Sequence, residues 1–577
     1  MFKTKNRTRT VVVTMPTSYS QDASDTRDSE VHVIDIENIV DPAGSATEET
    51  HGLQIQIEKV SGEQNMNGNG TINSKPKPVN LADVVEKARD TFNRGVTKPI
   101  EWRRQQLQNL LRLYTENQNA MIAALQKDLR RSKMEAVLLE TDYLINDLKN
   151  TLNNLEEWAK PERPSKGLVN MLDDVVIYND PYGVALVIGA WNYPLQLLLL
   201  PMAGAIAAGN VVIVKPSELA VACAQFIAEM IPKYLDNDAV IVVEGGPEET
   251  TELLKQKFDY IFYTGGTNVG KIVYAAATKY LTPVTLELGG KSPVYIDSTV
   301  DIRVTAKRVL WGKFINAGQT CIAPDYVLCS KEVQDKFIEA ARDILKEWYG
   351  DDAQKSPDLC RIINSRHFSR LQALVDACKS KIAIGGGCDP KERFIEPTIV
   401  ANVTGGEKIM EDEIFGPILP IVPVENAYEA IKFINAREKP LVLYVFSKDK
   451  DLVSNIVENT SCGGMCVNDT IMHMGVDTLP FGGVGNSGMG AYHGKATFDT
   501  FTHKKSCLVK NFAVIGEKLG SMRYPPYNDS KLNKITRLMA KRSMPSLSFL
   551  PYLLTFILGA GVSYGIFAWQ KIASEDL

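Results

Sequence analysis

Cys321 stands at the end of a short run of small and polar residues, Asn316-Ala-Gly-Gln-Thr-Cys321. A cysteine thiolate is a strong nucleophile toward a carbonyl carbon, and small neighbours let a substrate approach the backbone closely. Most free cysteines are buried packing residues, so this run alone is a weak signal. It nevertheless makes Cys321 a candidate for covalent catalysis on a carbonyl compound.

Glu287 is a candidate general base. It lies in Leu286-Glu287-Leu288-Gly289-Gly290-Lys291, at the end of an apolar run. Burial there would disfavour the charged carboxylate and raise its pKa toward neutrality, where a general base works well. A salt bridge between Glu287 and Lys291 is the alternative interpretation, and the sequence does not choose between the two.

Asn192 could stabilise a negative charge on oxygen. It lies in Trp191-Asn192-Tyr193-Pro194, after an apolar run at 183–188. An amide N–H that faces a pocket can donate to a developing oxyanion. Because Asn and Pro are also turn formers, the alternative is a simple turn.

Two further motifs follow apolar runs and indicate a phosphate-bearing ligand. Lys215-Pro-Ser-Glu218 comes after residues 211–214. Gly265 and Gly270 belong to Thr-Gly-Gly-Thr-Asn-Val-Gly-Lys, which comes after residues 260–263 and opens a helix. Ligands of open parallel sheets bind at the carboxyl ends of strands, and helix N-termini attract phosphate. The second motif is not a Gly-x-Gly-x-x-Gly fingerprint, so this signal is only suggestive.

The segments that must position these residues change period along the chain. Residues 81–129 show helical spacing, and a further helix runs to Trp158. Beyond it come five apolar, β-rich runs, mostly separated by helix-like stretches: Gly183–Ile188, Val211–Val214, Ala239–Val243, Tyr260–Tyr263 and Val284–Leu288. This alternation predicts a parallel sheet covered on both faces, and a second set of strands and helices follows to about residue 479.

The bulk composition bounds the remaining possibilities. A chain of 577 residues with 44% hydrophobic and 23% charged residues has room for two or three globular domains. The net charge of -5 gives no reason to expect a nucleic-acid partner. Nine irregularly spaced cysteines indicate a reducing compartment, and no set of residues indicates a metal site. Residues 1–80 are polar and Gly-rich, which predicts disorder.

The C-terminal region has a different character. Residues 547–569 contain no Asp, Glu, Lys or Arg, and about 20 apolar residues suffice to cross a bilayer. Basic residues precede this run: Lys531, Lys534, Arg537, Lys541 and Arg542. Their excess predicts that the N-terminal side faces the cytosol. A buried core helix or a hairpin in one leaflet is the alternative, which Pro551 keeps open.

Taken together, the motifs resemble the aldehyde dehydrogenase superfamily in order and spacing, over about residues 81–510. The resemblance is carried by FINAGQTCIAPDY, LELGGKSP, GAWNYP, VIVKPSE, EIFGPILP and PFGGVGNSGMGAYHGK. The variants are similar to the class 3 branch, whose membrane-bound members are the fatty aldehyde dehydrogenases. The long N-terminal segment departs from that pattern.

The resemblance implies an α/β fold in which a doubly wound parallel-sheet cofactor domain joins an α/β catalytic domain, with a C-terminal membrane helix. The expected segments are a disordered region (1–80), an NAD-binding domain with N-terminal helices (81–288), a catalytic domain (289–479), a return to the cofactor domain with an oligomerisation segment (480–515), a basic juxtamembrane linker (516–546) and a transmembrane helix (547–569).

It also implies a mechanism. Cys321 attacks the aldehyde to form a thiohemiacetal, whose oxyanion is held by the Asn192 side chain and the Cys321 backbone N–H. Hydride transfer to NAD(P) leaves a thioester, and Glu287 activates water to release the acid. Because a CoA-acylating relative lacks this glutamate, Glu287 argues against that rival reaction.

The cofactor residues follow from the same resemblance. Glu413, of Glu-Ile-Phe-Gly-Pro, is expected to hold the nicotinamide ribose, with Phe415 close to the ring. Lys215 and Glu218 match positions that contact the adenosine ribose, and the turn with Gly265 and Gly270 matches the one beside the diphosphate. A carboxylate at Glu218 favours a free 2′-hydroxyl, so NAD is expected, with NADP possible.

The substrate and location are inferred from the membrane segment. Medium- and long-chain aliphatic aldehydes are expected, because they partition into bilayers; small or aromatic aldehydes, or a tethered non-catalytic scaffold, are the alternatives. A homodimer at the endoplasmic reticulum, with a cytosolic catalytic domain, is what the family implies. His493 is interpreted as a packing residue rather than a catalytic one, since Cys321 and Glu287 already supply nucleophile and base.

Overall fold

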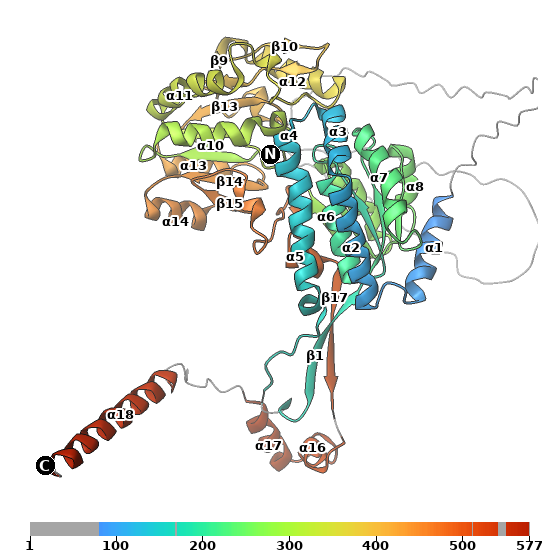
Figure 1. Cartoon of the computed structure of the whole chain (residues 1–577), viewed down its shortest axis with the longest axis vertical. Helices are drawn as coiled ribbons and strands as arrows, with labels where there is room; N and C mark the ends of the chain where they lie inside the picture. The colour runs from blue at the N-terminus through green and yellow to red at the C-terminus, as the bar shows by residue number, and fades with distance from the viewer. Residues whose placement is uncertain (1–79, 168–169, 511, 541–549, 576–577) are drawn as a thin grey trace, which may run out of the picture. The chain divides into compact units, whose positions relative to one another are not determined.

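The computed structural model describes residues 80–167, 170–510, 512–540 and 550–575 (Figure 1). The prediction of disorder for residues 1–80 therefore falls outside the described residues, except for Asn80. The Asn80 side chain accepts a hydrogen bond of 3.1 Å from the Ala82 N–H and caps the first helix. Two mainly parallel sheets organise the rest of the chain, as the alternating pattern predicted.

The first sheet has six strands in the order β16-β6-β5-β2-β3-β4. Five run parallel, and β16 lies antiparallel to β6. Their bounds are β2 Val184–Ile188, β3 Val211–Lys215, β4 Val240–Val242, β5 Tyr260–Thr264, β6 Val284–Glu287 and β16 Gly488–Met489. The five parallel strands are the five predicted apolar runs, so continuous apolar sequence did mark strands buried on both faces.

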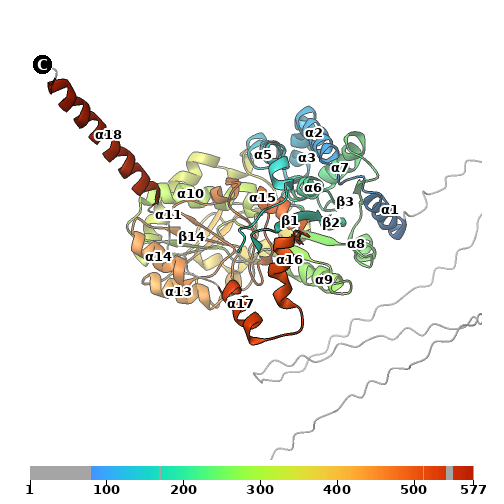
Figure 2. The same ribbon diagram turned by 90° about the horizontal axis from the view of Figure 1, so that it is seen from below.

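Helices cover both faces of this sheet (Figure 2). In β2, Ala185 and Val187 pack in one hydrophobic cluster, whereas Val184, Leu186 and Ile188 pack in another. The first cluster includes α2 Ile100–Glu116, α3 Gln118–Leu129, α5 Asp142–Ala159, α6 Gln196–Ala208 and α7 Val221–Tyr234. The second includes α1 Leu81–Asn93, α8 Pro247–Leu254 and α9 Thr267–Thr278. This two-sided cover is the doubly wound arrangement.

The second sheet has seven strands in the order β15-β14-β7-β8-β13-β12-β9, parallel except for β9. Their bounds are β7 Pro293–Ile296, β8 Tyr326–Cys329, β9 Ile382–Ile384, β12 Thr398–Val400, β13 Ile418–Pro423, β14 Val442–Phe446 and β15 Gly464–Val467. Its helices are α10 Ile302–Phe314, α11 Lys331–Tyr349, α12 Ser365–Ala377, α13 Ala427–Asn435 and α14 Lys450–Asn459. Cys329 is fully buried in β8, as a core residue should be.

The remaining elements lie outside the two sheets. β1 Asp174–Pro181 and β17 Thr502–Val509 pair antiparallel along their whole length, and β10 Cys388–Asp389 pairs with β11 Phe394–Ile395. The other helices are α4 Lys133–Ala136, a π-helical turn Val137–Thr141, α15 Lys495–Thr500, α16 Val514–Gly520, α17 Asp529–Met539 and α18 Leu550–Glu575. Short 3-10 turns lie at Ile315–Gly318, Ala353–Lys355, Lys379–Lys381, Lys408–Met410, Met472–Gly475 and Ser521–Arg523. Within the ranges that the structure describes, no helix is both long and apolar enough to cross a membrane.

Candidate active site

The nucleophile loop begins where α10 ends. Asn316, Ala317 and Gly318 take left-handed φ angles of 52°, 52° and 72°. A Cβ on Gly318 would lie 2.3 Å from the main-chain oxygen of Gly416, so only glycine lets these two loops approach so closely. The contact places the loop that contains Glu413 beside the loop that ends in Cys321.

Four residues singled out from the sequence converge on one cavity. Cys321, Glu287, Asn192 and Glu413 line a space of about 190 Å³. Its other lining residues are Ala190, Trp191, Leu197, Thr264, Gly265, Gly266, Leu288, Gly289, His367 and Phe415. The cavity therefore brings a nucleophile, two carboxylates and an amide within reach of one small molecule.

Glu287 ends β6, and its side chain is 2% exposed. Among the described residues neither carboxylate oxygen has a hydrogen-bond partner, and burial raises its pKa well above the ordinary value. The alternative salt bridge with Lys291 does not form, because the Lys291 Nζ donates to Asp325 Oδ2 over 2.6 Å. A buried, unpaired carboxyl group with a raised pKa has the properties of a general base.

The Cys321 thiol lies in a negative environment. Burial, followed by the charges of Glu413 and Glu287, raises its pKa to about 12. The thiol is therefore protonated at neutral pH in this state. Attack on a carbonyl carbon requires that its proton leave, so the nearby carboxyl groups matter for activation as well as for later steps.

Asn192 is held so that one amide hydrogen remains free. Its Nδ2 donates to the main-chain oxygen of Gln319 over 3.1 Å, which leaves the second Nδ2 hydrogen for another acceptor. The main-chain oxygen of Asn192 accepts from Arg131 Nη2 at 2.6 Å and from Asn316 Nδ2 at 2.9 Å. Asn192 is 3% exposed; the bond to Gln319 orients its side chain, and the two bonds to its main-chain oxygen hold its backbone.

A buried ion pair fixes the turn that carries Asn192. Arg131 pairs with Glu140, and both side chains are fully buried. The second Glu140 oxygen accepts from the backbone N–H groups of Leu195 and Gln196, at 2.8 and 3.0 Å, where α6 begins. We call Arg131 and Glu140 the clamp; neither was singled out from the sequence, because isolated charged residues are rarely fully buried.

Glu413 and Phe415 occupy the side of the cavity next to Gly289. A Cβ on Gly289 would lie 2.1 Å from Glu413 Oε2, so the glycine makes room for the carboxylate. Burial and then Asp325 raise the pKa of Glu413 to about 8, while the Gly290 N–H lowers it. The Phe415 ring meets Trp191 edge to face with the ring centroids 5.4 Å apart.

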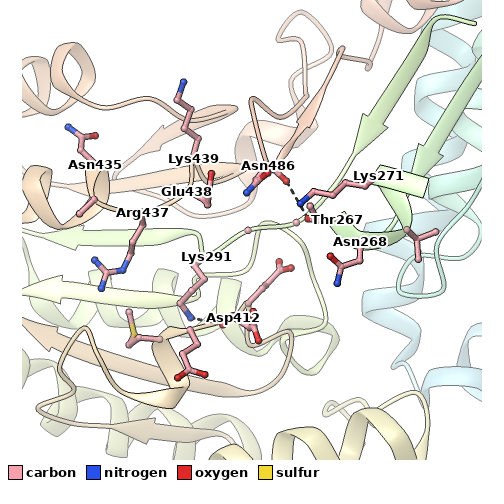
Figure 3. Close-up of a pocket in the computed structure, with 18 residues that line it drawn as sticks. Thr267, Asn268, Lys271, Lys291, Asp412, Asn435, Arg437, Glu438, Lys439 and Asn486 are labelled. Carbon is pink, nitrogen blue, oxygen red and sulfur yellow. Dashed lines mark hydrogen bonds between the residues drawn. The ribbon is translucent and has the colours of Figure 1, made fainter. Parts of the chain in front are cut away.

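A larger cleft of about 850 Å³ shares Glu413 and the start of α9 (Figure 3). Four cationic side chains line it: Lys271, Lys291, Arg437 and Lys439. Gly266 caps α9 without a side chain, and nothing lies within 4 Å of where its Cβ would be. An open helix N-terminus among cations suits a phosphate group, and the unpartnered Glu413 Oε1 suits a ribose hydroxyl, so the cleft fits a dinucleotide.

The other predicted cofactor residues lie close to these features. Gly265 lies beside the smaller cavity, and Gly270 packs so tightly that a Cβ would meet Leu288 Cδ2 at 2.7 Å. Lys215 ends β3 and donates to Glu218 Oε2 over 2.9 Å. Lys215 and Glu218 line neither cavity, so the geometry leaves their predicted role untested.

His493 lies apart from the Cys321 cavity. It is 2% exposed, adopts a left-handed φ of 81° and stacks on Phe481 with the ring centroids 4.9 Å apart. Burial lowers its pKa to about 3, so it is neutral. It lines a separate cavity of about 430 Å³ with Tyr143 and Asp147, which agrees with a packing role near the substrate-side loops.

The chain is similar to known aldehyde dehydrogenases over most of its length. The model of the aldehyde dehydrogenase family matches residues 72–507. Aldehyde dehydrogenase family 3 member A2 of Rattus norvegicus is 51% identical over 449 residues, covering 78% of this chain and 92% of the relative. The dimeric NADP-preferring aldehyde dehydrogenase of the same species is 50% identical over 446 residues, covering 77% and 98%.

Solved structures are similar as well. The substrate-bound state of Staphylococcus aureus AldH is 43% identical, with a TM-score of 0.77, and the match covers 79% of this chain and 99% of that one. Glyceraldehyde-3-phosphate dehydrogenase GapN from Methanocaldococcus jannaschii, complexed with NADP, is 25% identical, with a TM-score of 0.67 and coverage of 77% and 97%.

Proposed function

Since the chain belongs to the aldehyde dehydrogenase family, it oxidises aldehydes with NAD or NADP, and we propose that Cys321, Glu287 and Asn192 carry the reaction. The observation that supports these roles is their convergence. All three side chains line one cavity of about 190 Å³, together with Glu413 and Phe415. Nucleophile, base and oxyanion donor can therefore act on the same carbonyl group.

The first step is attack by Cys321. Its sulfur forms a bond to the aldehyde carbon while the thiol proton passes to a water molecule, and the carbonyl electron pair moves to oxygen. The free Nδ2 hydrogen of Asn192 and the Cys321 backbone N–H donate to that oxyanion. Because Gln319 and the clamp hold Asn192 in advance, little reorganisation is needed as charge develops.

A bound nicotinamide cofactor supplies the hydride acceptor. We propose that Glu413 accepts from its nicotinamide ribose, that Phe415 lies near its ring, and that the N-terminus of α9, with Gly265 and Gly270, faces its diphosphate. Lys215 and Glu218 are proposed to contact its adenosine ribose. The Glu218 carboxylate favours a free 2′-hydroxyl, which supports NAD with NADP as a second cofactor.

The last step is hydrolysis of the thioester on Cys321. The Glu287 carboxylate takes a proton from water, and the water oxygen attacks the thioester carbon. The C–S bond then breaks, the carboxylic acid leaves, and the sulfur regains a proton. A carboxyl group with no hydrogen-bond partner among the described residues and a raised pKa is suited to this transfer at neutral pH.

Cys321→Ser and Glu287→Gln test the two assignments together. We expect no NADH from Cys321→Ser, and from Glu287→Gln a burst of about one NADH per site followed by slow turnover, because acylation survives and hydrolysis does not. Rapid-mixing absorbance measures both. Steady turnover without a burst in Glu287→Gln would contradict its role as the base for hydrolysis.

We further propose that the substrates are medium- and long-chain aliphatic aldehydes and that residues 547–569 attach the enzyme to a membrane. The absence of charge in that segment supports attachment. So do the exposed apolar side chains of α18, such as Phe556, Leu558 and Val562 at 74%, 67% and 60%. Residues 516–546 would then be the basic linker, with Lys531, Lys534 and Arg537 on α17.

Turnover of an aldehyde series from two to sixteen carbons tests the substrate class, and we expect kcat/KM to rise with chain length. A maximum of kcat/KM at short or aromatic aldehydes would overturn the proposed substrate class but not the proposed reaction. For attachment, we expect the full chain to sediment with vesicles and Leu558→Lys to sediment less, because a charge in the apolar segment is costly there. Equal sedimentation would overturn the anchor.

We also propose how the chain assembles, what its two main domains do and where in the cell it lies. A homodimer is supported by the relative named dimeric and by the exposed Leu508 and Val509 on β17, at 52% and 47%. Residues 81–288 and 289–479 are proposed as the cofactor and catalytic domains, and 480–515 as the return to the cofactor domain with the oligomerisation segment. The endoplasmic reticulum with a cytosolic catalytic domain is the proposed location.

A further inference from the structure

Asn316 is a buried amide to which the reaction above assigns no role. The residue is 0% exposed, and its φ of 52° lies in the left-handed region that asparagine enters more readily than most residues. Its Oδ1 is buried without a hydrogen-bond partner among the described residues. An unpaired buried oxygen lowers stability, so packing alone does not explain an amide at this position.

Two carbonyl groups orient the Asn316 amide. Its Nδ2 donates to the main-chain oxygen of Asn192 over 2.9 Å and to the main-chain oxygen of Gln319 over 3.1 Å. A flipped amide would place Oδ1 against the same two oxygens, and acceptors do not bond to each other. The two Nδ2 hydrogens are therefore what this residue supplies, and the unpaired Oδ1 is the consequence.

These bonds close a ring between the turn that carries Asn192 and the nucleophile loop. Asn192 Nδ2 donates to the Gln319 main-chain oxygen over 3.1 Å, and that oxygen also accepts from Asn316 Nδ2 through its second lone pair. The other Asn316 bond returns to Asn192 itself. Because Gln319 lies two residues before Cys321, the ring links the side-chain donor to the oxyanion with the loop that carries the backbone donor.

The backbone of Asn316 is held separately from its side chain. Its N–H donates to Glu135 Oε2 over 3.0 Å. Its main-chain oxygen accepts from the Gln319 Nε2 over 3.0 Å and from the Gln319 N–H over 3.1 Å. The course of the loop at Asn316 therefore does not depend on the amide, whose bonds instead join the loop to Asn192.

We propose that Asn316 is a positioning residue that fixes the Asn192 side-chain donor relative to the Cys321 backbone N–H. The inference rests on the proposed role of these two donors at the oxyanion. A donor stabilises the oxyanion only when it is held where the charge develops, and a displacement of about 1 Å can slow a reaction about 100-fold. Asn316 lines neither the Cys321 cavity nor the larger cleft, so it acts through Asn192.

Asn316→Gly removes the bridge and keeps the conformation of the loop, because glycine adopts a left-handed φ without strain. Both carbonyl acceptors keep another donor in this variant. Arg131 Nη2 still donates to the Asn192 main-chain oxygen, and Asn192 Nδ2 still donates to that of Gln319. Since no buried carbonyl loses its last partner, the variant should fold, and its melting temperature checks this.

The test is the single-turnover rate of NADH formation, with the full chain and NAD in excess over octanal. For Asn316→Gly we expect the rate to fall about 10- to 100-fold, because the oxyanion donor is no longer held in place. The Kd for NADH should not change, since no oxyanion forms on binding. Asn316→Ala should lose as much, and Ala317 shows that the loop accepts alanine at a φ of 52°.

Ala317→Gly is the matched control for flexibility of the loop. Ala317 is the next residue, has the same φ of 52°, is 2% exposed and has no polar side-chain atom. Its replacement by glycine loosens the loop by as much as Asn316→Gly does, without removing a hydrogen bond, so the rate should stay close to the wild type. An equal loss of rate in the two glycine variants would overturn the proposal.

Alkylation of Cys321 by iodoacetamide distinguishes a misplaced donor from a displaced nucleophile. The thiolate attacks a saturated carbon and iodide leaves, so no oxyanion forms in this reaction. The alkylation rate at Cys321, followed by mass spectrometry of its peptide, should be the same in Asn316→Gly and in the wild type. Alkylation and NADH affinity that fall together with the single-turnover rate would show a general structural role and overturn the proposal.

Asn192→Ala separates this inference from the role proposed for Asn192. That variant should lose about 10²- to 10³-fold in single-turnover rate, and adding Asn316→Gly should slow it little further, because the donor that Asn316 positions is gone. An unchanged rate in Asn192→Ala would overturn the role of Asn192 itself. A slow Asn192→Ala beside a wild-type rate in Asn316→Gly, or losses that multiply in the double variant, would overturn the role of Asn316.

Discussion

The clamp of Arg131 and Glu140 and the buried groups of Lys313 and Glu413 lie near the nucleophile loop, but their hydrogen bonds differ. Both Glu140 oxygens have partners, and Arg131 also donates to the Asn192 carbonyl. Lys313 Nζ and Glu413 Oε1 have no partner in the residues that the structure describes. In the clamp only the Arg131 Nε lacks a partner among the described residues, whereas Glu413 Oε1 keeps capacity for a ligand.

This difference distinguishes residues that stabilise the structure of the site from residues that bind ligand or take part in the reaction. A buried charge with all its bonds filled makes one arrangement rigid, while unfilled groups reduce stability and are tolerated where function needs them. Glu287 belongs with the second kind, since both its oxygens lack partners among the described residues. Substitutions should therefore lower stability in the clamp and lower activity or cofactor affinity, without a stability cost, at the unfilled groups.

Glu287→Gln should have the largest effect. Steady turnover is expected to fall about 10²- to 10⁴-fold, as for other general bases. In the wild type, the hydrolysis rate should rise with pH through the raised pKa of Glu287, because the ionised form is the base. Stopped-flow measurement of the phase after the burst across pH gives both results.

The same variant should not lose stability. Because the folded protein binds the Glu287 proton more tightly than the unfolded chain, wild-type stability falls as pH rises above the unfolded pKa. Glu287→Gln removes that loss and should unfold at the same or higher urea concentration at pH 8. A clearly lower urea midpoint would show that Glu287, like the clamp, stabilises the fold.

Glu140→Gln should break the clamp. It leaves the Arg131 guanidinium buried without its carboxylate partner, which costs about 3–5 kcal/mol of unfolding free energy. Urea unfolding followed by tryptophan fluorescence measures the change, with Glu287→Gln as the matched variant at another buried glutamate. An equal loss of unfolding free energy in Glu140→Gln and Glu287→Gln would show that the two glutamates do not differ in their contribution to stability.

Asn192→Ala should have the next largest effect. Loss of one oxyanion donor is expected to lower kcat by about 10²- to 10³-fold, with little change in NADH affinity. Kinetics with saturating cofactor and a binding titration measure the two quantities. A loss of NADH affinity as large as the loss of kcat would mean that Asn192 shapes the cofactor cleft rather than the oxyanion site.

Lys307→Met should have the smallest effect. The pair of Lys307 and Glu347 is solvated, with side chains 40% and 50% exposed and 3.0 Å between the charged atoms. Exposed pairs contribute about 0.5 kcal/mol or less, so urea midpoint, kcat and NADH affinity should all stay close to the wild type. A change of several kcal/mol in unfolding free energy would contradict the small contribution expected of this exposed ion pair.

Much of the fold and of the candidate site could be predicted because it depends on local pattern. The five apolar runs became strands within one residue at either end, since strands buried on both faces need continuous apolar sequence. Cys321, Glu287 and Asn192 each follow or end a strand or loop that the pattern had already marked. Asn192 and Glu287 follow or end parallel strands of one sheet, whose ends meet at one edge, so their closeness follows from topology. Cys321 precedes β8 of the second sheet, so its place in the same cavity was decided by the tertiary structure.

The sequence by itself determined the chemical groups, their order and the strands and helices that carry them. Only the tertiary structure decided which charges are buried and which of those are paired. Arg131 and Glu140 look like solvated charges in the sequence, yet they bind the backbone of Asn192, Leu195 and Gln196, which lie 55 to 61 residues away. The environment of a charge depends on what surrounds it in space, and local periodicity carries no information about that.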